Sequence, residues 1–261
     1  MGSIRQPAVA GQFYPGDARQ LRQTVEKYIA EPGVKEAVAP KAIIAPHAGY
    51  IYSGPIAGTA YASLAQAIGA VRRVVLLGPA HWASVAGLAA SSAAAFATPL
   101  GLVHLDKRAQ EKIGTLPQVI VNDEAHKREH GLEVHLPFLQ VVFSDFTLVP
   151  LVVGDASASE VAEVLEKLWG GPETVIVISS DLSHYQDYET AVRLDKTTSE
   201  AIEAHRSLQE GQACGRKAIN GLLYLARQHR LTVRTVDLRN SGDTAGPRDR
   251  VVGYGAYLVT E

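Results

Sequence analysis

The sequence predicts an α/β fold: a three-layer α/β/α sandwich around a central sheet that is mostly parallel or mixed. Short apolar runs alternate with amphipathic segments of helical period along most of the chain, as expected when helices cover both faces of a sheet. Several runs are apolar at consecutive positions, which is typical of strands buried on both sides. The 261 residues contain no linker, repeat or low-complexity block, so we expect one domain that covers residues 1–261.

The apolar runs and the turn residues beside them give the expected element boundaries. The expected strands cover residues 41–45, 72–78, 147–154, 174–180, 231–238 and 251–259. The expected helices cover residues 18–30, 54–68, 106–113, 131–143, 157–169, 187–206 and 212–228. The 157–169 segment has the clearest limits, because serines followed by Glu160 form a capped start and a Gly-Gly-Pro sequence ends the helix.

Composition narrows the classes of protein that fit. Hydrophobic residues make up 46% and charged residues 20% of the chain, and the formal net charge is −2. No basic tract is present, so we expect no nucleic-acid partner. No apolar run approaches the roughly 20 residues that span a bilayer, and the N-terminus lacks a signal-peptide profile. We therefore expect a cytoplasmic protein with no membrane partner.

Three histidines follow three of the expected strands. KAIIA leads into His47, RRVVLLG into His81 and TVIVISS into His184. Because ligands of open α/β sheets bind outside the carboxyl ends of the strands, we expect these rings to share one site. Any single ring could instead hydrogen-bond only a loop carbonyl. Imidazole is the commonest protein metal ligand and needs a second group to fix its tautomer; Asp181 could supply that group or orient His184.

A second polar cluster, residues 123–138, contains His126, His130, Glu133 and His135. Its H-x-x-E-x-H spacing does not match the zinc-peptidase pattern, because five helical residues rotate by about 140° and separate His130 from His135. His130 and Glu133 can share a helix face and could line a pocket as acid/base groups; a solvated polar turn is the alternative. We expect four histidines at the surface: His104, His126, His205 and His229.

Two further features leave alternatives open. Cys214 is the single cysteine, so no intramolecular disulfide can form, and the residue is either a small buried apolar group or a chemical group. The RNSGDTAGPRDR loop at 239–250 lies between the last two expected strands. It either lines the mouth of a pocket or forms a turn stabilised by its Asn and Asp side chains.

Several long motifs occur in a fixed order: APHAGYIYSGPIAG, LLGPAHW, EHGLEVHLPFLQ, VISSDLSHY, CGRKAI and NSGDT. In this order they resemble the Memo family, whose prokaryotic members are called AmmeMemoRadiSam system protein B. The resemblance covers essentially the whole chain. The family is similar in fold to the class III, LigB-like extradiol dioxygenases, which are non-heme iron(II) enzymes that cleave catecholic rings with oxygen.

The resemblance implies a role for particular residues. APHAGY places a metal ligand at His47, GPAHW a second at His81 and CGR a third at Cys214, which favours the chemical role of the cysteine. SSDLSH places a further pocket pair at Asp181 and His184. His184 corresponds to the acid/base histidine of the dioxygenases.

The implied ligand set departs from the two histidines and one carboxylate of the dioxygenases. A thiolate is softer and donates more charge, which favours copper(I), zinc or an electron-rich iron. We expect iron(II) first, with copper or zinc as alternatives. The leading hypothesis is a metal-dependent oxidoreductase acting on a small molecule, by resemblance an aromatic diol. A peptide-binding module without catalysis and a zinc hydrolase are the alternatives. The names of prokaryotic relatives imply a functional link to radical-SAM and AMMECR-type proteins.

Overall fold

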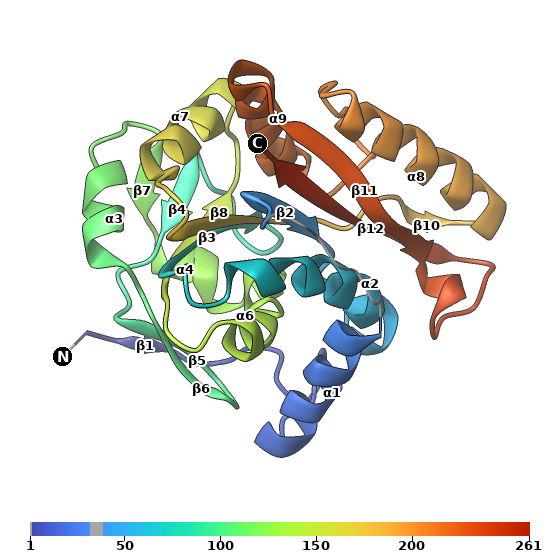
Figure 1. Ribbon diagram of the computed structural model, residues 1–261, viewed down its shortest axis with the longest axis horizontal. Coiled ribbons are helices and arrows are strands. Elements are labelled where there is room, and N and C mark those ends of the chain that lie inside the picture. Colours follow the sequence, from blue (N-terminus) through green and yellow to red (C-terminus); the bar gives the residue numbers. More distant parts are fainter. Residues whose placement is uncertain (1, 32–38) are drawn as a thin grey trace.

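A mixed nine-stranded sheet forms the centre of the computed structural model, which describes residues 2–31 and 39–261 (Figure 1). The strand order is β10-β12-β2-β9-β3-β8-β4-β7, and β11 pairs with β12 beside this path. The strands are β2 (Ala42–Ala45), β3 (Arg73–Pro79), β4 (Leu88–Ala90), β7 (Val119–Val121), β8 (Thr147–Val153), β9 (Thr174–Ser179), β10 (His184–Gln186), β11 (Thr232–Asn240) and β12 (Val251–Thr260). β2, β9, β3 and β8 run parallel, whereas β12 and β4 flank them in antiparallel pairs.

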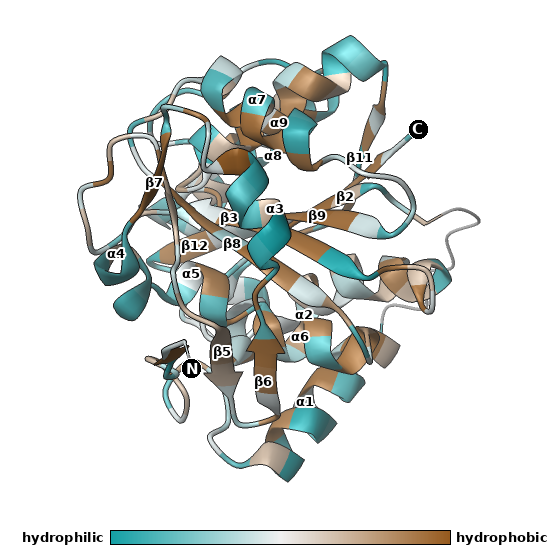
Figure 2. Cartoon of the chain, turned by 90° about the vertical axis from the view of Figure 1, so that its left-hand side faces the viewer, coloured by the Kyte–Doolittle hydropathy of each residue, from teal (hydrophilic) through white to brown (hydrophobic). Residues whose placement is uncertain are grey.

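Helices cover both faces of this sheet, which confirms the expected three-layer sandwich (Figure 1). The helices are α1 (Ala18–Ala30), α2 (Tyr50–Ala62), α3 (Lys107–Ile113), α4 (Asp123–Lys127), α5 (His130–Glu133), α6 (Leu136–Val142), α7 (Ala158–Leu168), α8 (Tyr188–Glu203) and α9 (Arg216–His229). In β3, Val74 and Leu76 pack in the core beneath α1, α2 and α6, whereas Val75 and Leu77 pack against α7 and α9. Successive strand residues point to opposite faces, so a strand that is apolar throughout serves two cores. Figure 2 shows these hydrophobic strands between the two helical layers.

All six expected strands form, with ends within two residues of those expected. A small second sheet was not expected; it consists of β1 (Ile4–Arg5), β5 (Ala95–Thr98) and β6 (Gly101–His104). Strands β4, β7 and β10 are equally short. Runs of two to four residues carry too little period to distinguish a strand from a loop, so their pairing is decided by tertiary contacts.

The segment expected as one helix over 131–143 is instead two short helices, α5 and α6. His135 is the N-cap of α6 and Pro137 lies in its first turn. Proline lacks an N–H group and its ring clashes with the carbonyl one turn earlier, so Pro137 favours the start of a new helix over a continuation of α5. The break allows α5 to place His130 at the site while Phe138 and Leu139 of α6 enter the core.

The helix expected over 54–68 begins earlier, at Tyr50, and ends in a 3-10 turn over Ser63–Ala67. It has almost no polar face: from Ser53 to Ala62 nearly every residue is buried. The sequence period that usually marks a helix is therefore absent at its start. Because the helix begins directly after His47-Ala48-Gly49, it closes the loop that carries the first candidate ligand.

The carboxyl ends of β2, β9 and β3 meet at one edge of the sheet. Ala45 pairs with Ser179, and Leu77 of β3 pairs with Ile178. The residues that follow these positions are thereby brought together, as the strand-end argument predicts. Among the residues that the structure describes, no helix is long and apolar enough to cross a membrane.

Candidate metal centre

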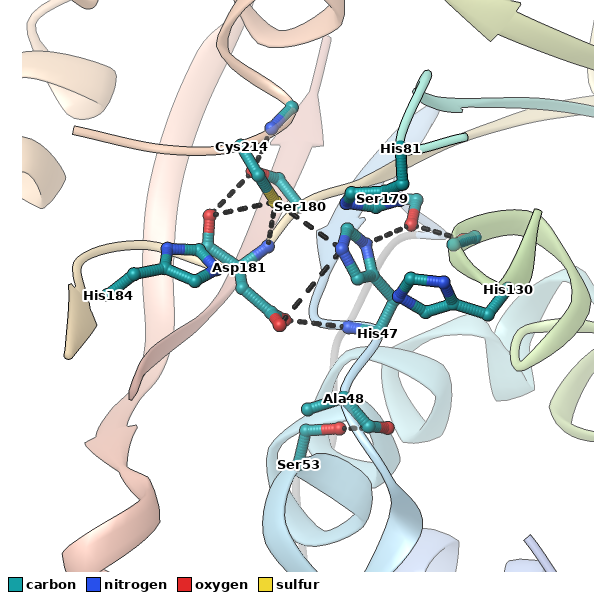
Figure 3. Close-up of polar contacts among 12 residues, drawn as sticks. His47, Ala48, Ser53, His81, His130, Ser179, Ser180, Asp181, His184 and Cys214 are labelled. Atoms are coloured by element: carbon teal, nitrogen blue, oxygen red, sulfur yellow. Dashed lines mark hydrogen bonds and ion pairs between the residues drawn. The ribbon is translucent and has the colours of Figure 1, made fainter. Parts of the chain in front are cut away.

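His47, His81 and Cys214 come together at this edge of the sheet (Figure 3). One potential ligand atom from each lies within 4.8 Å of the others, and Cys214 Sγ is 3.3 Å from His47 Nε2. His47 follows β2, His81 follows β3 and Cys214 lies in the turn before α9. His47 is buried, Cys214 is half-buried and the His81 side chain is 26% exposed. The cluster therefore opens toward solvent on the side of His81.

Hydrogen bonds orient the His47 ring. Its Nδ1 is 2.6 Å from Ser179 Oγ, and the Ser179 hydroxyl donates its proton to the Gly131 carbonyl. Ser179 must therefore accept from His47 Nδ1–H, which leaves a lone pair on Nε2, the nitrogen beside Cys214. Burial lowers the pKa of His47 well below its usual value, and the neighbouring His81 and His130 rings lower it further. The ring is thus kept neutral, as a metal ligand must be.

Glu129 performs the same task for His81. Its Oε1 is 2.7 Å from His81 Nδ1 and its Oε2 is 2.8 Å from the His81 backbone nitrogen. The Gly131 backbone N–H also donates to this carboxylate at 2.8 Å. Burial raises the pKa of Glu129, but these hydrogen bonds outweigh burial and leave the pKa below its usual value. An ionised Glu129 accepts a hydrogen bond from His81 Nδ1–H, so His81 Nε2 is free to bind a metal.

Gly131 connects the two groups that orient the rings, because it is hydrogen-bonded to both Glu129 and Ser179. A Cβ atom at this position would lie 3.0 Å from Glu129 Oε1, 3.4 Å from His81 Cε1 and 3.6 Å from His47 Nδ1. The Gly131 carbonyl in turn receives the Ser179 hydroxyl proton. A side chain here would press on the Glu129 carboxylate and lie in van der Waals contact with both imidazole rings.

Cys214 lies against the turn that follows β9. Its sulfur accepts a hydrogen bond from the Asp181 backbone N–H at 3.2 Å, and its own N–H donates to the Asp181 carbonyl at 3.2 Å. Burial, with a smaller contribution from the Asp181 carboxylate, raises the pKa of the thiol to about 12. A metal cation reverses that balance, because a coordinating thiol is deprotonated. Two imidazole Nε2 lone pairs and one sulfur form a donor set that fits a soft or borderline transition metal.

Asp181 and His184 both line the site but do not bind one another. Asp181 Oδ1 accepts from the His47 backbone N–H at 2.8 Å, and its Oδ2 is 4.0 Å from His47 Nε2. His184 Nδ1 donates instead to the Leu182 carbonyl at 2.8 Å. The expectation that Asp181 orients His184 or fixes an imidazole tautomer is therefore wrong: a backbone carbonyl and Ser179 do so. Because a carbonyl only accepts, the neutral His184 ring keeps its lone pair on Nε2.

His130 and Glu133 are separated by the structure. The His130 ring lies 4.5 Å from the His81 ring in a stacked arrangement and lines the site cavity. Glu133 points away: its carboxylate accepts from Tyr14 Oη at 2.6 Å and from the Ala8 backbone N–H at 2.7 Å, and pairs with Arg5. The expectation that Glu133 lines the pocket is wrong. A buried carboxylate must be paired and hydrogen-bonded, and the donors available to Glu133 lie in the N-terminal segment, not in the cavity.

Among the four histidines expected at the surface, His126 differs. It is 1% exposed, and its Nε2 is 3.0 Å from the Ala89 carbonyl. Burial lowers its pKa to about 4 despite that hydrogen bond. His104 and His229 are exposed, and His205 is half-buried. The surface expectation fails at His126 because α4 packs on β4, a contact that the local polar sequence did not indicate.

A cavity of about 490 Å³ lies over the cluster. Its lining includes His47, His81, His130, Asp181 and His184. The remaining described lining residues are Phe13, Ala48, Gly49, Tyr52, Tyr185, Ser241, Gly246, Pro247, Arg250, Val252 and Tyr254. The 239–250 loop thus lines the cavity mouth. Its Asn240 and Asp243 side chains also stabilise a turn over Ser241–Asp243, so both interpretations left open for it are confirmed. The site has both a ligand set and room for a small molecule beside it.

Fold and site together define an α/β protein with a two-histidine, one-cysteine cluster at the carboxyl edge of its sheet. The family model described as Memo-like protein matches residues 5–258. A "MEMO1 family protein" of Ignicoccus hospitalis is 37% identical over 97% of both chains, and one of Aquifex aeolicus is 37% identical over 96% of this chain and 97% of its own. The chain therefore belongs to the Memo family.

A solved structure supports the fold alone. The crystal structure of an uncharacterized protein from Escherichia coli K12 aligns with a TM-score of 0.50 at 13% identity, covering 83% of this chain and 98% of that one. At this identity the likeness concerns the arrangement of helices and strands, since one fold hosts many functions.

Proposed function

We propose that this chain is a metal-dependent oxidoreductase that acts on a small molecule, with His47, His81 and Cys214 as the metal ligands. The observation that carries the proposal is the orientation of the two rings. Ser179 and Glu129 each hold an Nδ1–H, so both rings keep an Nε2 lone pair for a metal, and one ligand atom of each ring lies within 4.8 Å of the Cys214 sulfur. A histidine ligand with a hydrogen-bonded second nitrogen is the usual arrangement at protein metal sites. Iron(II) is the proposed metal, with copper or zinc as alternatives.

A bound iron or copper ion supplies redox chemistry and coordination positions that the three protein ligands leave open. The protein supplies the rest. His184 holds its Nε2 lone pair toward the cavity, because its Nδ1 is tied to the Leu182 carbonyl. It accepts a proton from a substrate hydroxyl and returns it later, which is general acid/base catalysis. His130 lines the wall on the side of His81 and positions the substrate.

Metal content tests the ligand set. The protein is purified anaerobically without added metal and analysed for bound elements beside Cys214→Ala and His81→Ala. His104→Ala, which removes an exposed histidine from β6, is the matched control. We expect near-stoichiometric iron or copper in the wild type and in the control, and at least a tenfold loss of metal affinity in the two ligand variants. Full metal retention in Cys214→Ala would remove the thiolate from the site.

Turnover tests the acid/base assignment. Catechols are supplied with oxygen to the wild type and to His184→Ala, both loaded with metal. The variant is expected to keep its metal but to lose roughly 100-fold or more in rate, in the range that general acid/base groups contribute. Unchanged turnover would end the assignment of His184. Zinc alone in the wild type would favour a hydrolase, and no metal would favour a binding module.

A further inference from the structure

The cavity over the metal centre has two chemically different ends. Its floor is formed by the histidine cluster and Asp181, which is 4% exposed. Its mouth is formed in part by Tyr185 of β10 and by Arg250, which directly precedes β12. Both mouth residues are exposed. A ligand in the cavity can therefore lie between this exposed pair and the histidine cluster.

Tyr185 is held in an unusual backbone conformation. Its φ is +60°, in the left-handed region, although it carries a bulky side chain. It lies where the pairing of β10 with β12 shifts register, between His184 and Gln186. Its side chain is 63% exposed. Strain of this kind persists where the surrounding structure demands it, and it is concentrated at functional sites.

Arg250 lies over this tyrosine. Its guanidinium carbon is 4.5 Å from the centroid of the Tyr185 ring. Within the part of the chain that the structure describes, Arg250 has neither an ion pair nor a hydrogen bond. Stacking on the ring presents the planar guanidinium with its donors unused, and such a fork matches the geometry of a carboxylate.

Arg248, two residues earlier on the same loop, differs from Arg250 because it has polar partners within the protein. It also stacks on a tyrosine, with its guanidinium carbon 4.3 Å from the centroid of the Tyr188 ring. It lies 4.0 Å from the Asp243 carboxylate, and its Nε donates to the Gly242 carbonyl at 3.4 Å. It does not line the cavity. The two arginines thus differ in whether a protein carboxylate already neutralises them.

The charged and aromatic residues of the cavity lining indicate which class of ligand Arg250 could bind. Among the described lining residues, Arg250 is the one arginine or lysine, and Asp181 is the one carboxylate. Asp181 is held at the floor by the His47 backbone N–H. Three further aromatic rings, Phe13, Tyr52 and Tyr254, line the same cavity. The lining therefore combines a single permanent cation with flat aromatic surfaces.

We propose that the substrate of this site is an aromatic compound that bears one carboxylate, with the carboxylate bound by Arg250 at the mouth and the ring below it. This inference rests on the proposed function, which places the reacting end of the molecule at the metal centre. A phosphate monoester carries up to two negative charges and would be matched better by more than one cation. One guanidinium fork suits one carboxylate.

Calorimetric titration under anaerobic conditions tests the charge preference. The probes are para-hydroxybenzoate and para-hydroxybenzamide, which share a ring and a shape but differ in charge, together with phenyl phosphate. We expect the wild type to bind the acid roughly tenfold more tightly than the amide, the scale of one charge-assisted contact. Arg250→Gln should abolish that preference by weakening the acid alone, and Arg248→Gln, the matched control, should preserve it.

Several outcomes would overturn the inference. They are equal affinity for acid and amide, including no detectable binding of either; an equal loss of the acid preference in Arg248→Gln; and tighter binding of phenyl phosphate than of the acid. Repeating the titration with Cys214→Ala separates this inference from the proposed function. Failure of the metal assignment alone leaves the acid preference intact in every protein with Arg250. Failure of this inference removes the preference while the metal content of the wild type is unaffected.

Discussion

Glu129 is the N-cap of α5 and Glu133, four residues later, is its last residue; both are 1% exposed, yet they serve different regions. Glu129 accepts from His81 and Gly131 and so supports the metal centre. Glu133 accepts from Arg5, Tyr14 and the backbone of the N-terminal segment and so attaches that segment to the body of the protein. Burial and donor saturation are common to both, so neither property identifies a functional residue. What distinguishes the two glutamates is which groups donate hydrogen bonds to them.

The largest effect is expected at Glu133. Glu133→Ala leaves Arg5 buried without its partner and removes the acceptor for Tyr14, so the free energy of unfolding should fall by about 3–5 kcal/mol. Urea unfolding followed by circular dichroism measures this loss. Metal bound per folded molecule should remain that of the wild type. A loss of metal affinity from folded protein would contradict the division between the two glutamates.

His126, a buried histidine outside the metal centre, should make the free energy of unfolding depend on pH. The unfolded His126 ring takes up a proton near its usual pKa of about 6.5, whereas burial holds its folded pKa at about 4. Between these values the unfolded chain binds more protons. The free energy of unfolding should therefore fall as pH drops from about 6.5 to about 4, by up to about 3 kcal/mol, and this contribution should level off below that.

His126→Gln keeps an N–H donor for the Ala89 carbonyl and does not titrate. Urea unfolding at a series of pH values, with wild type and variant side by side, should show a shallower acid loss in the variant. Equal slopes would show that His126 does not set the acid limit of the fold.

The smallest effect on stability but a specific one on metal is expected at Glu129. Glu129→Gln retains one oxygen acceptor but replaces the charged acceptor of the His81 Nδ1–H hydrogen bond with a neutral one. Metal affinity should therefore fall by about 10–100-fold. Competition against a chelator measures the affinity, with Glu133→Gln as the matched control. An unchanged affinity in Glu129→Gln, or an equal loss in the control, would show that Glu129 is a structural group like its neighbour.

Much of the fold could be predicted because its signals are local. The strand over 174–179 is apolar from Val175 to Ile178, and the capped helix over 158–168 has its start and stop in sequence. The candidate ligands were also within reach, since His47 and His81 each follow a strand and the CGR motif singles out Cys214. The errors fall where local pattern is weak or misleading, as at the Pro137 break and in the short strands.

The supporting groups of the site were out of reach for a different reason. Glu129 is 48 residues from His81, and Ser179 is 132 residues from His47. No periodicity or spacing connects such positions before the sheet order is known. Glu129 was part of a run of charged residues, and the sequence contains no sign that it, rather than Glu133, faces the histidines.

Sequence periodicity alone sufficed for the three layers and for the strand ends that carry His47 and His81, because burial on two faces demands continuous apolar runs. Which nitrogen of each ring is free, and which carboxylate supports the site, depends on contacts that exist only when β2, β9 and β3 lie side by side. Those contacts join residues far apart in the chain, and hydrogen bonds are decided by distances in space.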